Sequence, residues 1–307
     1  MVCYLSCMRL VTYSRLGVPS IGVELEKGIL DIPEAASRFG RQYHIHGHSF
    51  PHSILDLLRW DSGIEVVKQI VSSYHKTPLD EKPMLYNKSS ISYEAPIQRP
   101  GKIIALGLNY RDHIEETGRD IPDFPVIFAK FPSCVVGPDT EVKVPEVTKQ
   151  LDWEVELGIV MGHLTKNVEP ENALDKVAGY TIINDLSARD LQHSEGQWVR
   201  GKSLDGLCPM GPSIVTTDEL GDASGLRMHT KVNGVTKQES NTSNLLFGTK
   251  EIVSFLSKSF SLEPGDVIAT GTPSGVGFAR DPPEFLNPGD EVELYIEKIG
   301  YLRNRIV

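Results

Sequence analysis

The stretch DWEVEL at residues 152–157 alternates acidic and apolar residues, and it is the most informative part of the chain. In a β-strand, successive side chains point to opposite faces of the sheet. Asp152, Glu154 and Glu156 would therefore share one face, while the apolar residues between them would share the other face, which suits a core. The stretch predicts a strand that carries a row of three carboxylates.

Such a row raises an electrostatic problem. Glu154 and Glu156 would lie about 6.6 Å apart along the strand. At that separation two carboxylates repel by roughly 2.5 kcal/mol if the effective dielectric constant is about 20. A buried row therefore needs a bound cation or a proton, and hard carboxylate oxygens suit Mg²⁺, Mn²⁺ or Ca²⁺ better than Zn²⁺. By itself, the stretch is also consistent with an edge strand whose acidic face is solvated.

A further acid follows a second apolar run. Residues 178–183 are apolar and lead directly to Asn184 and Asp185. An acid at the end of a buried strand is well placed to ligate a metal held by another strand. The alternative is a helix start, with Asp185 as N-cap and Arg189 paired four residues later. The polar residues that follow could bind an anionic substrate: Arg189, Gln192 and Lys202.

The segment NYRDHIEE at residues 109–116 predicts a short helix with His113 and Glu116 on one face. A carboxylate beside a histidine orients the ring and raises its basicity, which suits a general base for water. A surface His–Glu pair without a catalytic role is the alternative.

The segment TGTPSGVG at residues 270–277 is a glycine-rich loop after a predicted strand. It lacks both the ending of a P-loop and the glycine order of a Rossmann fold, so it does not indicate nucleotide binding. It permits close approach of the backbone to a ligand, or it is an ordinary tight turn.

Composition narrows the class of protein. The 307 residues carry a net charge of −10, and the whole acidic excess lies in residues 81–307. An acidic surface repels phosphate backbones, so we expect no nucleic-acid partner. No apolar run approaches the ~18 residues of a membrane span, so we expect no membrane partner either. The four cysteines contain no C-x-x-C pair, which fits a reducing compartment.

The chain is predicted to have two parts joined by a linker. We place a small N-terminal domain at residues 1–80, a proline-dotted linker at 81–99 and a larger domain at 100–307. Residues 1–7 are a possible extension before Met8. The histidine-rich segment 43–52 lies far in sequence from the acids, and we interpret it as a solvated loop.

The predicted elements mix strands and helices irregularly, which favours an α+β, β-rich fold over a wound βαβ fold. A hairpin and two helical stretches, split near residues 61–63, are expected in the N-terminal part. The expected strands and helices are these: hairpin 21–32; helices within 53–75 and at about 111–117, 170–177 and 249–258; strands 102–108, 153–161, 180–183 and 291–296.

Five motifs in order resemble the fumarylacetoacetate hydrolase superfamily. They are G-L-N-Y-x-x-H-x-x-E, D-W-E-x-E-L, N-D-x-S-A-R-D-x-Q, G-K-S and T-G-T-P-x-G-V-G, and they lie between residues 102 and 277. The separate N-terminal domain resembles the branch that contains acylpyruvases, oxaloacetate decarboxylases and oxaloacetate tautomerases. The resemblance implies a mixed-sheet β-roll catalytic domain with a small N-terminal α+β domain, and a homodimer.

The resemblance also implies roles for the residues in these motifs. Glu154, Glu156 and Asp185 match the metal carboxylates of the family, which bind Mg²⁺ or Mn²⁺, with Ca²⁺ as a further possibility. His113 and Glu116 match a water-activating dyad on a mobile lid. The other matching positions hold substrate and stabilise negative charge: Lys202, Arg189, Gln192, Thr272 and, less specifically, Lys130.

The implied activity is that of a divalent-metal-dependent enzyme acting on small 2-oxo (diketo) acids. Our leading expectation is C–C bond hydrolysis of acylpyruvate-like substrates or decarboxylation of oxaloacetate, each through a metal-bound enolate. One alternative is an oxaloacetate keto–enol tautomerase on the same scaffold, and another is a non-catalytic family member. We expect a cytoplasmic protein, with the mitochondrial matrix as the alternative location.

Overall fold

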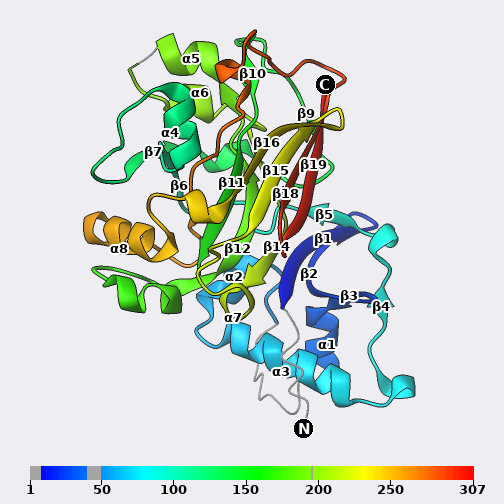
Figure 1. Cartoon of the computed structure of the whole chain (residues 1–307). Helices are drawn as coiled ribbons and strands as arrows, with labels where there is room; N and C mark the ends of the chain where they lie inside the picture. Colours follow the sequence, from blue (N-terminus) through cyan, green and yellow to red (C-terminus); the bar gives the residue numbers. More distant parts are fainter. Residues whose placement is uncertain (1–7, 40–49, 195) are drawn as a thin grey trace.

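A computed structural model describes residues 8–39, 50–194 and 196–307 (Figure 1). Within these ranges, strands form sheets of twelve, five and two strands, and helices lie around them. The prediction of an α+β, β-rich chain with a small N-terminal domain is confirmed. The possible extension 1–7 and most of the histidine-rich segment lie outside the described residues, and of that segment His52 is exposed. None of the described helices is long and apolar enough to cross a membrane.

The N-terminal part is a strand meander covered by helices, drawn in blue and cyan at the bottom of Figure 1. The predicted hairpin is confirmed, because β2 and β3 pair antiparallel around the turn at residues 26–27. The two predicted helical stretches are also present and are separated at residues 60–62. The elements are β1 (Arg9–Arg15), β2 (Val18–Leu25), β3 (Gly28–Asp31), α1 (Ile32–Phe39), α2 (Ile54–Arg59) and α3 (Gly63–Lys76).

One sheet runs through both parts of the chain. Strand β1 pairs antiparallel with β14 (Cys208–Thr216), with Leu10 opposite Ile214. Two short strands form in the segment predicted as a linker: β4 (Leu85–Tyr86) pairs with β3, and β5 (Ser92–Glu94) pairs with β1. The order of the sheet is β4-β3-β2-β1-β14-β12-β11-β17-β6-β7.

The strands at the centre of this sheet carry the candidate site. The order mixes directions, because β17 and β6 are parallel whereas β11 and β12 are antiparallel. All seven residues of β11 and all eight of β12 are buried, so both faces of these strands are covered. The bounds are β6 (Ile103–Gly107), β7 (Val126–Lys130), β11 (Val155–Met161), β12 (Val177–Asn184) and β17 (Val267–Ala269).

The strand predicted at 153–161 begins two residues later than expected. Leu151 and Asp152 form a separate short strand, β10, and β11 starts at Val155. Between them the backbone leaves the ladder, because the Glu154 N–H donates to the Asn184 side chain at 3.1 Å. The Val155 N–H donates to the Gln238 side chain at 3.0 Å. Side-chain oxygens therefore take the place of backbone carbonyls as acceptors for these two N–H groups.

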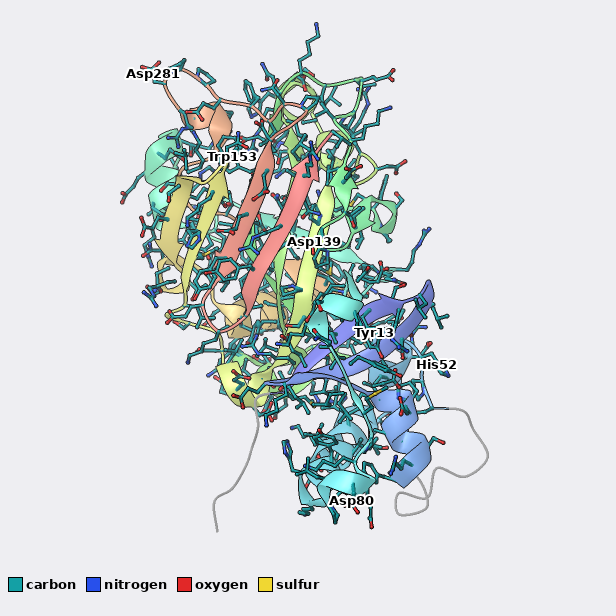
Figure 2. The ribbon with its side chains drawn as sticks, turned by 90° about the vertical axis from the view of Figure 1, so that its right-hand side faces the viewer. Tyr13, His52, Asp80, Asp139, Trp153 and Asp281 are labelled. Carbon is teal, nitrogen blue, oxygen red and sulfur yellow. The ribbon has the colours of Figure 1, made fainter. Side chains whose placement is uncertain are left out.

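A five-stranded sheet packs against the central strands to enclose the larger core. Apolar residues of β11, such as Leu157, lie in one cluster with Met228 and Leu294 of the second sheet. Trp153, labelled in Figure 2, belongs to the same cluster and is 1% exposed. Burying each such side chain contributes about 1.5–3 kcal/mol. The sheet consists of β16 (Val235–Asn241), β15 (Arg227–Val232), β18 (Glu291–Ile296), β19 (Gly300–Ile306) and β9 (Glu141–Val142).

Two of the three predicted helices of the larger part are confirmed, and one is wrong. Helices α4 (Arg111–Thr117) and α8 (Thr249–Ser259) form as expected. Residues 170–177 instead form two 3₁₀ turns, and Val177 already begins β12. Pairing of buried Val177 with β11 outweighs the local helical pattern. The remaining short elements are β8 (Val135–Val136), β13 (Ser187–Ala188), α5 (Arg189–Ser194), α6 (Val199–Lys202) and α7 (Thr217–Leu220).

Candidate metal centre and active site

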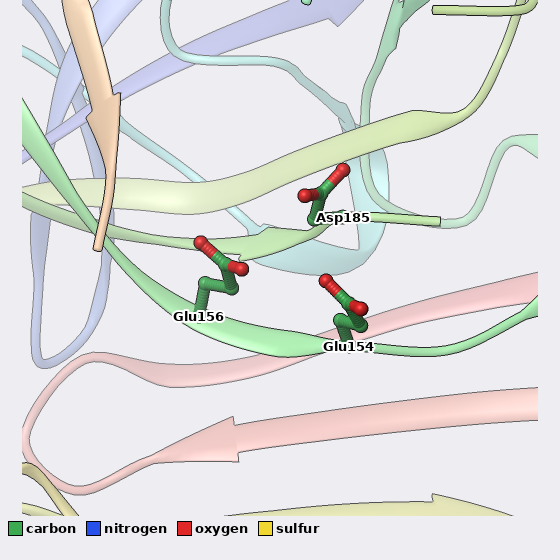
Figure 3. A group of neighbouring side chains, drawn as sticks. All are labelled: Glu154, Glu156 and Asp185. Atoms are coloured by element: carbon green, nitrogen blue, oxygen red, sulfur yellow. The ribbon is translucent and has the colours of Figure 1, made fainter. Parts of the chain in front are cut away.

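Three buried carboxylates meet where β11 begins and β12 ends (Figure 3). Val155 lies opposite Asn184 in the antiparallel register, which brings Glu154 and Glu156 next to Asp185. One oxygen from each carboxylate lies within 4.8 Å of the others. The three residues are 5%, 1% and 0% exposed, respectively. The alternative of a solvated acidic face is therefore wrong.

Buried cations neutralise part of this cluster. The Lys202 Nζ donates to Glu154 Oε2 at 2.7 Å and to Asp185 Oδ2 at 2.8 Å. Lys130 Nζ lies 2.7 Å from Asp185 Oδ1, and the Arg189 Nη2 donates to Glu154 Oε1 at 2.6 Å. Burial alone would raise the pKa of Glu154. The charges of Lys202 and Arg189 outweigh burial and lower that pKa to about 2.

Glu156 is the carboxylate left without a cation among the described residues. Its Oε2 accepts a hydrogen bond from the Gly271 N–H at 2.8 Å. Burial and the charges of Asp185 and Glu154 raise the pKa of Glu156 well above its ordinary value of 4.5. A proton or a cation must supply the missing charge, and this all-oxygen donor set fits a divalent cation.

The predicted histidine–glutamate pair forms on helix α4. His113 Nδ1 lies 2.9 Å from Glu116 Oε2, and the imidazole ring is largely buried. An ionised Glu116 holds the proton on Nδ1, which leaves Nε2 as the basic nitrogen. The base of the helix is fixed by Asn109, whose side chain donates to the Thr270 carbonyl at 2.8 Å.

The glycine-rich loop 270–277 contacts both Glu156 of the carboxylate cluster and Glu116 of the histidine–glutamate pair. Its Gly271 N–H binds Glu156, and its Gly275 N–H donates to Glu116 Oε1 at 2.8 Å. Gly275 has φ +98°, and a Cβ there would lie 2.1 Å from the Lys237 carbonyl oxygen, so only glycine fits. Thr272 is buried in the same loop and donates to the Val155 carbonyl at 3.1 Å.

Asp152 does not join the three clustered carboxylates. Its Oδ2 accepts from the Arg189 Nε at 2.8 Å and from the Phe278 N–H at 3.1 Å. Its Oδ1 accepts from the Gly277 N–H at 2.7 Å and from the Trp153 N–H at 2.8 Å. Asp152 therefore holds Arg189 and the end of the glycine-rich loop in place.

Replacing Asp152 by Asn should destabilise the protein by about 3–5 kcal/mol, the typical cost of breaking one partner of a buried ion pair. The amide NH₂ would face donors in either orientation, namely Arg189 and the Phe278 N–H in one, or the Gly277 and Trp153 N–H groups in the other. Urea unfolding in the presence of a chelator measures the loss. Asp175→Asn, at an exposed position, is the matched control. An unchanged midpoint for Asp152→Asn would show that Asp152 does not hold the loop.

A cavity of about 400 Å³ collects most of the predicted site residues. Glu116, Asp185 and Lys130 are not in its lining, and each contacts a residue that is: Glu116 contacts His113, and the other two contact Lys202. The predicted residues in the lining are His113, Glu154, Glu156, Arg189, Gln192, Lys202 and Thr272.

Several lining residues were not predicted from the sequence. Phe128 and Trp198 form an apolar wall, with ring centroids 5.4 Å apart in an edge arrangement. Phe278 lies under the Arg189 guanidinium, 4.4 Å from ring centroid to Cζ. Phe128 lies two residues before Lys130 on β7, so strand alternation could have placed it on the same face. Leu106, Arg119 and His193 also line the cavity.

This fold and this cluster of carboxylates define a known class of enzyme. Residues 102–307 match the family model described as fumarylacetoacetate (FAA) hydrolase C-terminal. The chain belongs to the fumarylacetoacetate hydrolase family and is an enzyme of that family, as its motifs predicted.

Individual relatives align with nearly the whole length of this chain. Oxaloacetate tautomerase fahd2, mitochondrial, of Xenopus laevis is 39% identical over 98% of this chain and 90% of its own length. Oxaloacetate tautomerase YisK of Bacillus subtilis is 40% identical over 96% of this chain and 97% of its own length. The structure of fumarylacetoacetate hydrolase from Exiguobacterium antarcticum superimposes with a TM-score of 0.79 at 35% identity. The superposition covers 97% of this chain and 99% of the Exiguobacterium antarcticum chain.

Proposed function

We propose that the protein is a divalent-metal-dependent oxaloacetate tautomerase, which interconverts the enol and keto forms of that 2-oxo acid. The observation that carries the proposal is the similarity over 96–98% of this chain to proteins named oxaloacetate tautomerase. This similarity favours the tautomerase alternative over C–C bond cleavage, which was our leading expectation. The Xenopus laevis relative is named as mitochondrial and YisK is bacterial, so we keep the cytoplasm as the proposed location and the mitochondrial matrix as its alternative.

The candidate site offers a binding place for the 2-oxo end of such a substrate. Glu154, Glu156 and Asp185 would hold the cation, and we propose Mg²⁺ or Mn²⁺ from the hard oxygen donors. When bound, the cation would polarise the 2-oxo group and favour loss of a proton from the adjacent carbon. Gln192 lines the same cavity, and its amide NH₂ can donate to the substrate while its oxygen accepts from Arg189. Thr272 also lines the cavity, and its hydroxyl, whose hydrogen goes to the Val155 carbonyl, can accept a hydrogen bond there.

Tautomerisation transfers one proton between the substrate's C3 and its 2-oxygen, so the site needs a base and a group that stabilises the oxyanion. His113 supplies the base, because Glu116 keeps its Nδ1 protonated and leaves Nε2 able to take the C3 proton. The resulting imidazolium would return that proton to the 2-oxygen, which completes the enol and restores the neutral imidazole. Lys202 uses two ammonium hydrogens on Glu154 and Asp185, and its third can donate to the 2-oxygen. Phe128 and Trp198 would provide an apolar wall beside the reacting carbon.

The test follows oxaloacetate with the purified protein and Mg²⁺ or Mn²⁺, with a chelator as control. Enol absorbance and pyruvate release are recorded in the same cuvette. We expect metal-dependent acceleration of enol decay without pyruvate. Pyruvate formed at the rate of enol loss would overturn the proposal in favour of decarboxylation. No change in either signal would exclude oxaloacetate as substrate and move the search to other diketo acids.

A further inference from the structure

The cations that line the cavity differ in how they are paired. Arg189 forms ion pairs with Asp152 and Glu154, and Lys202 forms them with Glu154 and Asp185. Arg119 also lines the cavity, yet it forms no ion pair with any acid in the part of the chain that the structure describes. Its charge is therefore the one that those carboxylates leave available to a ligand.

The end of helix α4 holds Arg119 at this position. Gly118 adopts a left-handed conformation, with φ +61° and ψ +30°, and its N–H donates to the Glu115 carbonyl at 3.3 Å. The Arg119 N–H donates to the Ile114 carbonyl at 3.2 Å, which closes the helix end. Helix α4 also carries His113, and Arg119 follows the last residue of the helix by two positions. Figure 1 shows α4 at the end of the molecule that also holds α5 and α6, whose residues line the cavity with Arg119.

Arg119 and His193 lie in the same cavity lining. His193, on α5, is a lining residue that stacks edge-on against Phe278, with centroids 5.2 Å apart. Burial, and then the charges of Arg189 and Arg119, lower the pKa of His193. Arg119 therefore provides the permanent positive charge on this side of the cavity.

We propose that Arg119 binds the distal carboxylate of a four-carbon dicarboxylic 2-oxo acid and so determines which 2-oxo acids the enzyme accepts. This inference rests on the proposed function, which places the first carboxylate and the 2-oxo group at the cluster of acids. The second carboxylate then needs a positive partner that is not already neutralised, and a guanidinium binds carboxylates through paired hydrogen bonds. A 2-oxo acid with an uncharged end makes no such contact.

The test compares ligands that differ only in the distal group. Calorimetry with Mg²⁺ measures the dissociation constants of malate and of 2-hydroxybutyrate, which replaces the distal carboxylate by a methyl group. Arg119→Gln should weaken malate binding by about 10- to 100-fold and leave 2-hydroxybutyrate unchanged. Arg119→Lys should restore part of the difference. KM for oxaloacetate should rise in parallel with the malate constant, while kcat changes less.

Arg111→Gln is the matched control, because Arg111 is exposed at the other end of α4 and does not line the cavity. It should leave both dissociation constants unchanged. Equal binding of malate by wild type and Arg119→Gln would overturn the inference, as would equal weakening of both ligands. The two proposals can fail separately. If Arg119→Gln weakens malate binding but the wild type does not tautomerise oxaloacetate, the proposed reaction is refuted and the role of Arg119 stands.

Discussion

Replacing Glu156 by Gln should remove tight Mg²⁺ and Mn²⁺ binding and reduce tautomerase activity by more than about 100-fold. Changes to residues behind the ligands of a metal already cost about 10- to 100-fold in affinity, so loss of a direct ligand exceeds that range. Glu156 is the best position to change because no lysine or arginine among the described residues forms an ion pair with it. Glu154→Ala, in contrast, would leave Lys202 and Arg189 each without one buried partner.

Without metal, the same Glu156→Gln substitution should not lower the stability of the protein. The raised pKa of Glu156 means that its charged form destabilises the fold. Stability contributed by the protonated form is fully present below the ordinary pKa of 4.5 and is lost as pH rises through the raised pKa of the folded state. Glu156→Gln should therefore be at least as stable as wild type at neutral pH in a chelator. Urea unfolding measures this, and calorimetry measures the metal.

For the same reason, metal affinity of the wild type should fall as the pH falls, because protons compete for Glu156. Glu146→Gln is the matched control, since that side chain is 90% exposed. Wild-type metal affinity in Glu156→Gln would refute the assignment of the three carboxylates.

Replacing His113 by Asn should lower kcat for oxaloacetate tautomerisation by about 10²- to 10⁴-fold, the usual contribution of a general base. Metal affinity should stay near that of the wild type, because His113 is outside the carboxylate cluster. Glu116→Gln should cause a smaller loss, since it leaves the imidazole in place and alters the partner of Nδ1 and the acceptor of the Gly275 N–H. Stopped-flow enol absorbance gives kcat, and calorimetry gives the metal constant.

His163→Asn is the control for this series, because His163 is exposed and lies outside the cavity lining. Full activity in His113→Asn would assign the proton transfer to another group, of which His193 is the nearest candidate by chemistry. Loss of metal binding together with activity would show that His113 acts through the structure of the site instead.

Sequence periodicity predicted part of the site well. Alternation in DWEVEL placed Glu154 and Glu156 together, and helical spacing placed His113 beside Glu116. Both patterns are local, within four residues, and the structure retains the proximity that they predict. The decision between a metal centre and a solvated face required burial, which depends on the second sheet packing over β11.

Contacts between distant residues could not be predicted in this way. Asp152 binds the Gly277 N–H across 125 positions of sequence, and no local pattern marks that pairing. Arg119 was missed because an exposed arginine after a helix is ordinary, and only the fold shows that it faces the cavity. The false helix at 170–177 shows the converse, since its local pattern was helical but sheet pairing of Val177 decided the structure.

The pairing of β1 with β14 has a consequence for synthesis of the chain on the ribosome. Leu10 leaves the ribosome about 200 residues before its partner Ile214, a delay of roughly 10–40 s at about 5–20 residues per second. An unpaired strand edge in a nascent chain invites aggregation during such a delay. Strand β5 emerges much earlier and pairs with Thr12 to Ser14. It thus shields most of that edge and leaves only Arg9 and Leu10 waiting for the strand that completes the sheet.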